Sequence, residues 1–402
     1  MGTPIGATLI SEDGIQPVVD VAAELACPTG LIELQYAYGP DLVPPPEALS
    51  EGMWRWRNLL PLEDGPILYP LPVGGTPLLA LPGLRRLIGL PSLYLKTETR
   101  SPTGSNKDRA TALVLEYALR EGATTVTAAS TGNVAVSLAT GAAASGVRAV
   151  IFVPEDVGEG KLRMMRATGA TVFRVRGGYK DAFKLSRACA TAYGWLDRNT
   201  GANPVTLEAK KTVALEIWDQ LGREVPDVVV VPVGDGTTLS GIGKGFRELI
   251  ACGVSDRGPR LLGVQAEGCQ PLKRIWAGEE PVESVGTIAD GINVSYPING
   301  VTAVRDVRDS GGAFIAVSDD AIRAAISTLS HNGGVLAEPA AAAGFAALEP
   351  ALEAGLLAPD EHIVVVITGS GMKTLHYLQP GGAEYVVEGH DVSEVEQALH
   401  RS

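Results

Sequence analysis

Residues 227–250 read DVVVVPVGDGTTLSGIGKGFRELI, and this stretch decides the fold class. The run 227–232 is apolar without alternation, which is typical of a strand buried on both faces of a parallel sheet. A polar glycine segment, 233–239, follows that strand, and 240–250 has the periodicity of a helix. A glycine loop between strand and helix offers backbone N–H groups and hydroxyls to an anion, so we expect a phosphate cradle here. The cradle residues are Gly234, Asp235, Gly236, Thr237 and Thr238.

This cradle differs from the two common nucleotide fingerprints. The chain has no G-x-x-x-x-G-K-[ST] motif, and Leu239 stands where a dinucleotide fingerprint needs its third glycine or alanine. A single terminal phosphate therefore fits the loop better than a pyrophosphate does. A dinucleotide-dependent oxidoreductase remains the alternative from another class, and a non-catalytic metabolite-binding protein is a third.

Two further polar loops follow strand-like runs. The strand 363–367 leads into Thr368 and a Gly-Ser-Gly turn, and the strand 124–126 leads into Ser130, Thr131, Gly132 and Asn133. In open α/β sheets, ligands bind beyond the carboxyl ends of the strands. We therefore expect all three loops to converge on one crevice.

The segment SPTGSNKDR, residues 101–109, carries a single lysine, Lys107, on a polar glycine turn. Burial lowers the pKa of a lysine, and a lysine with a lowered pKa is a nucleophilic amine suited to a Schiff base with an aldehyde cofactor. A solvated lysine at the start of a helix is the alternative interpretation of these nine residues.

Six segments, in the same order along the chain, resemble the fold-type II pyridoxal phosphate enzymes of the tryptophan synthase β-subunit family, and within it the threonine synthases. They are GMWRWRNLLPL (52–62), GGTPLLALPGL (74–84), SPTGSNKDRAT (101–111), ASTGN (129–133), VGDGTT (233–238) and TGSGMK (368–373). The resemblance extends from about Cys27 to His376. It implies pyridoxal 5'-phosphate as the cofactor, an amino-acid substrate and a homodimer.

The resemblance also assigns roles to individual residues. Lys107 would bind the cofactor and act as the catalytic base, Asn133 would bond the ring hydroxyl oxygen, and the five cradle residues would surround the phosphate. Thr368 would face the pyridine nitrogen, where a neutral hydroxyl makes the ring a weaker electron sink and favours elimination and replacement. The residues expected to bind the substrate are Asn106, Ser130, Thr131 and Gly132.

Several positions depart from the family pattern. Cys27 stands alone where threonine synthases commonly carry a C-x-x-C pair, so we expect no zinc. Asn106 replaces the usual aromatic residue before the lysine. Thr200, Gly201 and Thr206 stand where the family places Asn, Ser and Arg side chains on the substrate phosphate.

The loss of that arginine matters because a fixed cation is the usual means of binding a phosphate. Arg174, Arg176 and Lys211 are the candidates to replace it. The resemblance implies a lyase for which O-phosphohomoserine, converted into threonine and phosphate, is the first candidate substrate. A β-eliminating or β-replacing enzyme, such as a threonine/serine dehydratase or cysteate synthase, remains the alternative within the family.

The composition fits a protein of small-molecule metabolism. The chain has 402 residues and a formal charge of −13, from 33 basic against 46 acidic residues, and no basic run, so we expect no nucleic-acid partner. No apolar run approaches membrane-spanning length, so we expect no membrane partner. The four cysteines show neither metal spacing nor a disulfide framework, which favours a reduced, cytoplasmic setting.

The fold prediction is α/β, with two domains, mostly parallel open sheets and the cofactor in the crevice between them. An N-terminal segment, 1–60, packs on a large domain made of 61–112 and 206–385. A smaller domain, 113–205, is inserted into it, and 386–402 forms a peripheral tail. Two weaker candidates for the site are His331 and Glu338, the second before a proline that begins a helix.

Overall fold

Three sheets make up the strand framework of this computed structural model, which describes residues 4–11, 14–18, 31–47, 52–201, 203–387, 389 and 392–400. The largest sheet has six strands in the order β12-β11-β10-β13-β5-β4, and each neighbouring pair is parallel except β4 with β5. Its strands are β4 (Leu78–Leu79), β5 (Leu93–Thr97), β10 (Val228–Pro232), β11 (Arg260–Ala266), β12 (Ala313–Val317) and β13 (Ile363–Ile367).

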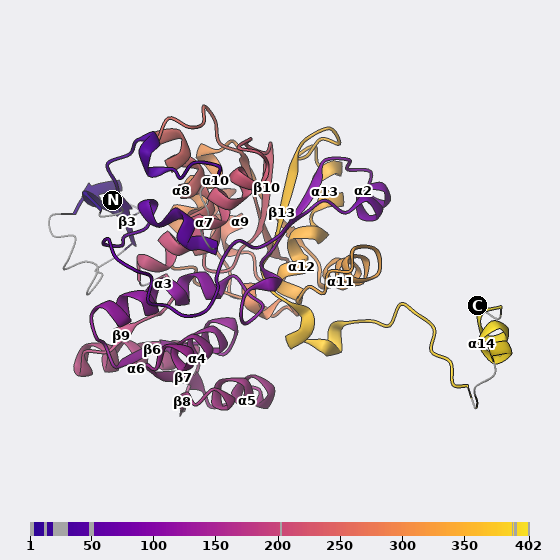
Figure 1. The fold of residues 1–402 in the computed structure, drawn as a ribbon, viewed down its shortest axis with the longest axis horizontal. Coiled ribbons are helices and arrows are strands. Elements are labelled where there is room, and N and C mark those ends of the chain that lie inside the picture. The colour runs from indigo at the N-terminus through magenta and orange to yellow at the C-terminus, as the bar shows by residue number, and fades with distance from the viewer. Residues whose placement is uncertain are drawn as a thin grey trace.

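Helices cover both faces of this sheet, as the continuous apolar strands require. Alternate residues of β10 enter different cores: Val228 and Val230 pack with one group of helices, and Val229 and Val231 with the other. The first group is α2 (Pro82–Ile88), α11 (Asp319–Gly333), α12 (Pro339–Ala346) and α13 (Leu348–Glu353). The second group is α7 (Val205–Gln220), α8 (Thr237–Ala251), α9 (Pro271–Trp276) and α10 (Gly300–Asp309). Figure 1 shows the two groups on opposite sides of β10 and β13.

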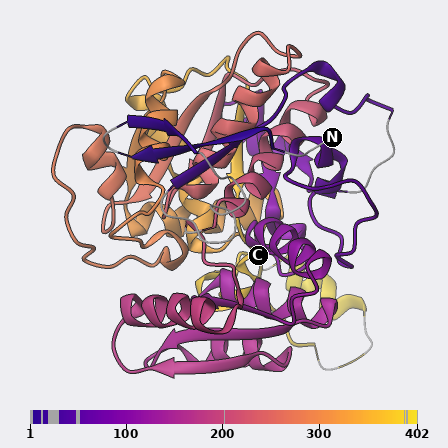
Figure 2. The same cartoon turned by 90° about the vertical axis from the view of Figure 1, so that its left-hand side faces the viewer.

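A second, all-parallel sheet forms the lower part of the molecule in Figures 1 and 2, in the strand order β8-β7-β6-β9. Its strands are β6 (Thr125–Ala129), β7 (Arg148–Pro154), β8 (Thr171–Val175) and β9 (Leu196–Asp197). One face packs on α3 (Lys107–Arg120), α4 (Asn133–Ser145) and α5 (Glu159–Ala167), and the other on α6 (Tyr179–Tyr193).

The N-terminal part adds a small antiparallel sheet, β2-β1-β3, that packs on the core formed by α7, α8 and α10. Its strands are β1 (Gly6–Ser11), β2 (Gly14–Pro17) and β3 (Leu31–Gln35). Short 3₁₀ helices occur at η1 (Pro40–Leu42), η2 (Gly52–Leu59), η3 (Glu98–Arg100), η4 (Asp290–Ile292), η5 (Gly371–Lys373) and η6 (Leu375–Tyr377). The last helix, α14 (Val392–Leu399), buries no residue and lies apart from the body in Figure 1.

The α/β fold class with mostly parallel sheets is confirmed. Two boundaries differ from expectation: β6 continues to Ala129, and α8 begins at Thr237 rather than Ser240. Thr237 and Thr238 therefore belong to the first turn of the helix. The domain boundaries stay a prediction.

None of the described helices is long and apolar enough to cross a membrane. The described residues also contain no cluster of three or more His, Cys, Asp or Glu side chains that could hold a metal ion. Cys27, where the sequence predicts the absence of zinc, lies outside the described residues.

A fully buried ion network joins the two parts of the body. Arg109 on α3 binds Glu98 at 2.7 Å and Glu216 of α7 at 2.6 Å, and Lys96 of β5 binds Glu216 at 2.7 Å. The two cations and two carboxylates balance, and Thr76 bonds to both Glu98 and Arg109. Because an unpaired buried charge is costly, this network fixes the position of α3 on the large sheet.

The substitution Arg109→Ala is expected to lower the free energy of unfolding by about 3–5 kcal/mol, since it leaves the buried carboxylate of Glu98 without a cation and Glu216 with Lys96 alone. Urea unfolding measures the loss. Arg163→Ala is the control, because Arg163 pairs with Glu159 on the exposed face of α5 and should cost under about 1 kcal/mol. Equal losses in the two variants would contradict the role given to the network.

Candidate active site

Lys107 is the first residue of α3, at the end of a loop that its neighbours hold in place. The carboxylate of Asp108 accepts hydrogen bonds from both the backbone N–H and the hydroxyl of Thr103, at 2.8 and 2.7 Å. Gly104 turns the chain with φ +68°, and a Cβ there would lie 3.0 Å from the Cβ of Ser370. A left-handed turn this close to another segment favours glycine. The Lys107 side chain is half-buried at the end of this turn.

The loop of Lys107 is joined to the loop that follows β13. The N–H of Asn106 donates to the carbonyl of Thr368 at 2.9 Å, and the N–H of Ser370 donates to the carbonyl of Gly104 at 2.8 Å. These bonds form an isolated antiparallel bridge between Ser105 and Gly369, beyond the ends of the parallel strands β5 and β13. Lys107 and Thr368, predicted from separate motifs, therefore lie at one edge of the sheet.

The cradle at 234–238 has the geometry expected of an anion-binding turn. The carboxylate of Asp235 accepts from the N–H of Thr237 at 3.0 Å, and the hydroxyl of Thr237 donates to Asn299 at 2.8 Å. Gly236 has φ +92°, and a Cβ there would lie 2.5 Å from the carbonyl oxygen of Asn299. The amide of Asn106 donates to the hydroxyl of Thr238 at 3.2 Å, which connects the cradle to the lysine loop.

The third predicted segment begins α4. The hydroxyl of Ser130 accepts from the N–H of Gly132 at 3.1 Å, and Thr131 and Gly132 are half-buried. The amide nitrogen of Asn133 donates to Glu338 at 2.7 Å. Glu338 is the N-cap residue of α12 and packs on Gly369, so Asn133 is linked to the Thr368 loop.

All three predicted loops and the lysine thus form one connected site. Asn133 joins Glu338, Glu338 packs on the loop after β13, and this loop bonds to the loop of Lys107. Asn106 completes the chain of contacts by reaching the cradle. The other weak candidate, His331, is different: its ring bonds to the carbonyl of Gln379.

The sequence did not predict two buried basic residues beside Lys107, which are Arg198 and Lys210. Arg198 follows β9, and its guanidinium bonds to the hydroxyl of Thr111 at 3.0 Å, the hydroxyl of Thr200 at 2.7 Å and the carbonyl of Lys107 at 3.1 Å. Burial lowers the pKa of Arg198 to about 10, although nearby carboxylates, Asp235 foremost, oppose the shift. The second cation, Lys210, lies on α7 and has no exposed surface.

Lys210 and Asp235 influence one another. Burial lowers the pKa of Lys210 well below its ordinary value, the charge of Lys107 adds to this effect, and Asp235 opposes it. Burial by itself would raise the pKa of Asp235, but Lys210 and Lys107 together bring it below its ordinary value. Asp235 is therefore a carboxylate, and the amines of Lys107 and Lys210 lie near it.

The three departures from the family pattern carry no positive charge into the site. Thr200 accepts from Arg198, and Thr206 donates to the carbonyl of Asn203, just before its own helix, at 2.7 Å. Gly201 has φ +81°, and a Cβ there would lie 3.0 Å from Asn299. The expected arginine position is therefore occupied by side chains that fold back on the protein.

The cations proposed as replacements from the sequence do not reach the site. Arg174 donates to the carbonyl of Glu155 from the edge strand β8, and the side chain of Arg176 is 91% exposed. Lys211 is buried, but it lies on another face of α7 and pairs with Glu208 and Glu248. A single residue along a helix turns the side chain by about 100°, which is why Lys210 and Lys211 have different partners.

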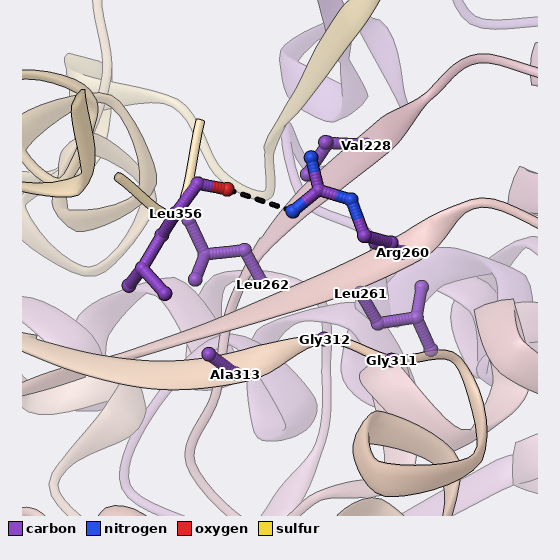
Figure 3. A pocket seen from close by; sticks show the side chains of 8 residues that line it. All are labelled: Val228, Arg260, Leu261, Leu262, Gly311, Gly312, Ala313 and Leu356. Atoms are coloured by element: carbon purple, nitrogen blue, oxygen red, sulfur yellow. Dashed lines mark hydrogen bonds between the residues drawn. The ribbon is translucent and has the colours of Figure 1, made fainter. Parts of the chain in front are cut away.

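A small cavity of about 40 Å³ lies elsewhere, at the amino ends of β10, β11 and β12 (Figure 3). Arg260 crosses its mouth and donates to the carbonyl of Leu356 at 2.8 Å. A volume of this size holds little more than a water molecule. The cavity is thus at the opposite edge of the sheet from Lys107 and is unrelated to the site.

The donor set of the site fits an aldehyde that also carries a phosphate. A lysine amine stands at the start of one helix, an N–H cradle stands at the start of another, and the buried Nζ of Lys210 has no hydrogen-bond partner among the described residues. Glycine loops, helix N-termini and buried cations together favour a phosphorylated ligand. These features define a cofactor site of the kind that binds pyridoxal phosphate.

Comparison with known proteins also indicates a pyridoxal phosphate enzyme. Residues 69–369 match the family model described as pyridoxal-phosphate dependent enzyme, and the chain belongs to this family. The chain is 37% identical over 353 residues to threonine synthase of Methanocaldococcus jannaschii, covering 86% of this chain and 87% of that protein. It is 37% identical over 319 residues to threonine synthase of Mycobacterium leprae, covering 79% and 87%. The chain is accordingly a pyridoxal phosphate-dependent, threonine synthase-like lyase.

Solved structures show the same fold. The crystal structure of a threonine deaminase from T.th. is 29% identical and superimposes with a TM-score of 0.61, covering 73% of this chain and 92% of that one. Maize serine racemase is 22% identical with a TM-score of 0.65, covering 81% and 92%, and supports the fold alone. The family match and the threonine synthase relatives, rather than these structures, argue against the oxidoreductase and the non-catalytic binding protein considered from the sequence.

The substitution Gly236→Ala is expected to destabilise the protein by about 2–4 kcal/mol, from the left-handed backbone and the overlap with Asn299. It should also weaken cofactor binding, because the cradle must move. Gly222→Ala is the matched control, since Gly222 has φ +73° but open space around its Cβ position. Thermal unfolding and cofactor titration of both variants separate overlap from backbone strain; equal effects would show that the cradle tolerates a methyl group.

Proposed function

We propose that this enzyme converts O-phosphohomoserine into threonine and inorganic phosphate. The observation that carries the proposal is the position of Lys107 beside both a phosphate cradle and two buried cations, Arg198 and Lys210. A substrate with its own phosphate needs such a cation, since charge-assisted bonds hold phosphates most strongly. The threonine synthases at 34–37% identity support the same reaction.

In this proposal, Lys107 holds the cofactor through its Nζ, and the same atom removes and returns the proton of the substrate α-carbon. The cofactor, when bound, draws electron density away from that carbon. The cradle residues, 234–238, hold the cofactor phosphate at the N-terminus of α8. Lys107 is well placed for both tasks because the Asp108–Thr103 clasp fixes the start of α3.

Substrate binding is assigned to the start of α4 and to Asn106. Ser130, Thr131 and Gly132 lie at the start of α4, which suits the substrate carboxylate because helix N-termini attract anions. The N–H groups of Ser130 and Gly132 already donate to the carbonyl of Phe152 and the hydroxyl of Ser130, so the N–H of Thr131 is the backbone donor assigned to the substrate. The amide of Asn133 has two N–H donors, one of which binds Glu338. The other is available for the ring hydroxyl oxygen of the cofactor.

One observation favours a second candidate, a β-eliminating enzyme that acts on serine or threonine. Thr200, Gly201 and Thr206 provide no charge where the family binds the substrate phosphate. The threonine deaminase from T.th., at 29% identity, is of this kind by its title. The two candidates differ in whether the substrate must carry a phosphate.

We also infer that the enzyme works in the cytoplasm as a homodimer. The support is the family resemblance, together with Cys189, Cys252 and Cys269, which are free thiols in this structure. Size-exclusion chromatography coupled to light scattering measures the oligomer: a mass of about twice 41.8 kDa supports the dimer, and any other mass contradicts it.

The assay of O-phosphohomoserine with the pyridoxal phosphate form should release phosphate and form threonine at equal rates. Lys107→Ala should lower the rate by at least about 10²–10⁴-fold, the usual contribution of a general base, and abolish the absorbance of the lysine-bound cofactor. Lys184→Ala, on the exposed side of α6, is the control. If neither product appears while the cofactor absorbance is intact, the substrate belongs among β-substituted amino acids instead.

The substitution Thr368→Asp should lower the main activity by about tenfold or more, which is about 1.4 kcal/mol of barrier. A carboxylate facing the ring nitrogen would favour its protonation and open competing reactions, whereas a hydroxyl does not. Thr368→Ser keeps the hydroxyl and is the control. An increase in threonine formation in Thr368→Asp would overturn the role given to Thr368.

A further inference from the structure

We propose that Lys210 binds the phosphoryl group of a ligand in this site. The inference rests on the proposed function, because it takes the ligand to be a phosphate monoester. Two molecules supply that chemistry, the cofactor and the substrate. The observation behind the proposal is a fully buried lysine side chain whose Nζ has no hydrogen-bond acceptor among the described residues.

The packing of α7 on α8 directs Lys210 toward the site. Gly241 lies one helical turn after Thr237, and a Cβ at Gly241 would lie 2.9 Å from the Cβ of Lys210. The glycine allows the two helices to approach closely enough for Lys210 to lie beside the first turn of α8. The charged groups that act on Lys210 are Lys107 from α3, Asp235 from the cradle and Arg198 after β9.

Basic groups outnumber carboxylates around Lys210, and this excess favours an anion. Three basic side chains, Lys107, Arg198 and Lys210, lie near a single carboxylate, Asp235, and that carboxylate already accepts from the N–H of Thr237. Asp108 also acts on Arg198, but it is bound to Thr103. The N-terminus of α8 adds positive partial charge to the same place.

Asp197, the other carboxylate near Arg198, is likewise engaged, because it accepts from the N–H and amide of Asn199 at 2.8 and 2.7 Å.

The neighbouring Lys211 has the ion pairs expected of a lysine that stabilises the fold. It is as buried as Lys210, yet it pairs with Glu208 at 2.6 Å and Glu248 at 2.8 Å. An ammonium has three donors, and burying it without partners is costly. Lys210 is therefore built to receive a ligand rather than to hold the fold.

The same surroundings couple phosphate binding to a proton. Burial first, then the charges of Lys107 and Arg198, lower the pKa of Lys210, and Asp235 only partly offsets them. A dianion beside the Nζ raises that pKa again, so the amine takes up a proton as the ligand binds. By linkage, affinity falls as pH rises through the range between the ligand-free and the bound pKa.

The test compares wild type, Lys210→Gln, Lys210→Arg and the surface control Lys184→Gln. Calorimetric titration of each holoenzyme with inorganic phosphate, in two buffers of different ionisation enthalpy, gives affinity and proton uptake together. The rate at which each holoenzyme loses cofactor on dilution gives cofactor retention. Thermal unfolding confirms that each variant is folded, and Lys210→Met replaces Lys210→Gln if that variant is not.

If Lys210 binds the substrate phosphate, Lys210→Gln weakens inorganic phosphate binding at least tenfold and abolishes proton uptake, with cofactor retention unchanged. If it binds the cofactor phosphate, Lys210→Gln speeds cofactor loss at least tenfold, and phosphate binding is unchanged. In both cases Lys210→Arg restores part of the effect. The proposal is wrong if Lys210→Gln matches Lys184→Gln in both measurements.

These measurements do not depend on turnover. An enzyme that fails to convert O-phosphohomoserine but binds phosphate through Lys210 refutes the proposed function and keeps this inference. An enzyme that forms threonine while Lys210→Gln leaves both measurements unchanged supports the proposed function and refutes this inference.

Discussion

The buried ion network around Arg109 is the constraint on which the rest of the site depends. Arg109 lies two residues after Lys107, so the bonds to Glu98 and Glu216 that fix one also fix the other. Glu98 follows β5 and Glu216 belongs to α7, the helix that carries Lys210. Three elements that each contribute to the site are therefore held by charges that must stay paired. The loop that carries Lys107 can be short and rich in glycine because Arg109, two residues later, fixes the start of α3.

The site forms where the two parallel sheets meet. Helix α3 packs on β6 through residues such as Leu113, and the same core includes Val205 and Ala209 of α7. Loops from the carboxyl ends of β6, β9, β10 and β13 consequently face one another, which is the arrangement expected of open α/β sheets. The electrostatic character of the site follows from this geometry: cations from α3, α7 and the end of β9 converge on Asp235. The overall charge of −13 gives no indication of this local concentration.

Much of the fold and of the site could be predicted from the sequence, because the informative patterns are local. A strand, a glycine loop and a helix follow one another directly at 227–250, so the cradle is visible without tertiary information. Arg198 and Lys210 are different. Nothing local separates Lys210 from Lys211, and only the packing of α7 on α8 decides which of them faces the site. The antiparallel N-terminal sheet was not predicted either, since β1 pairs with β3, a strand far along the chain, and no local pattern shows that pairing.

The bond between Asn133 and Glu338 joins residues that are 205 positions apart in the chain. Glu338 is 8% exposed and lies against the backbone of Gly369, where no side chain larger than hydrogen fits beside it. A substitution at one of these positions therefore changes the surroundings of the other. A change at 133 that removes the donor leaves a buried carboxylate to be neutralised, and a change at 338 frees the amide to turn away from the ring.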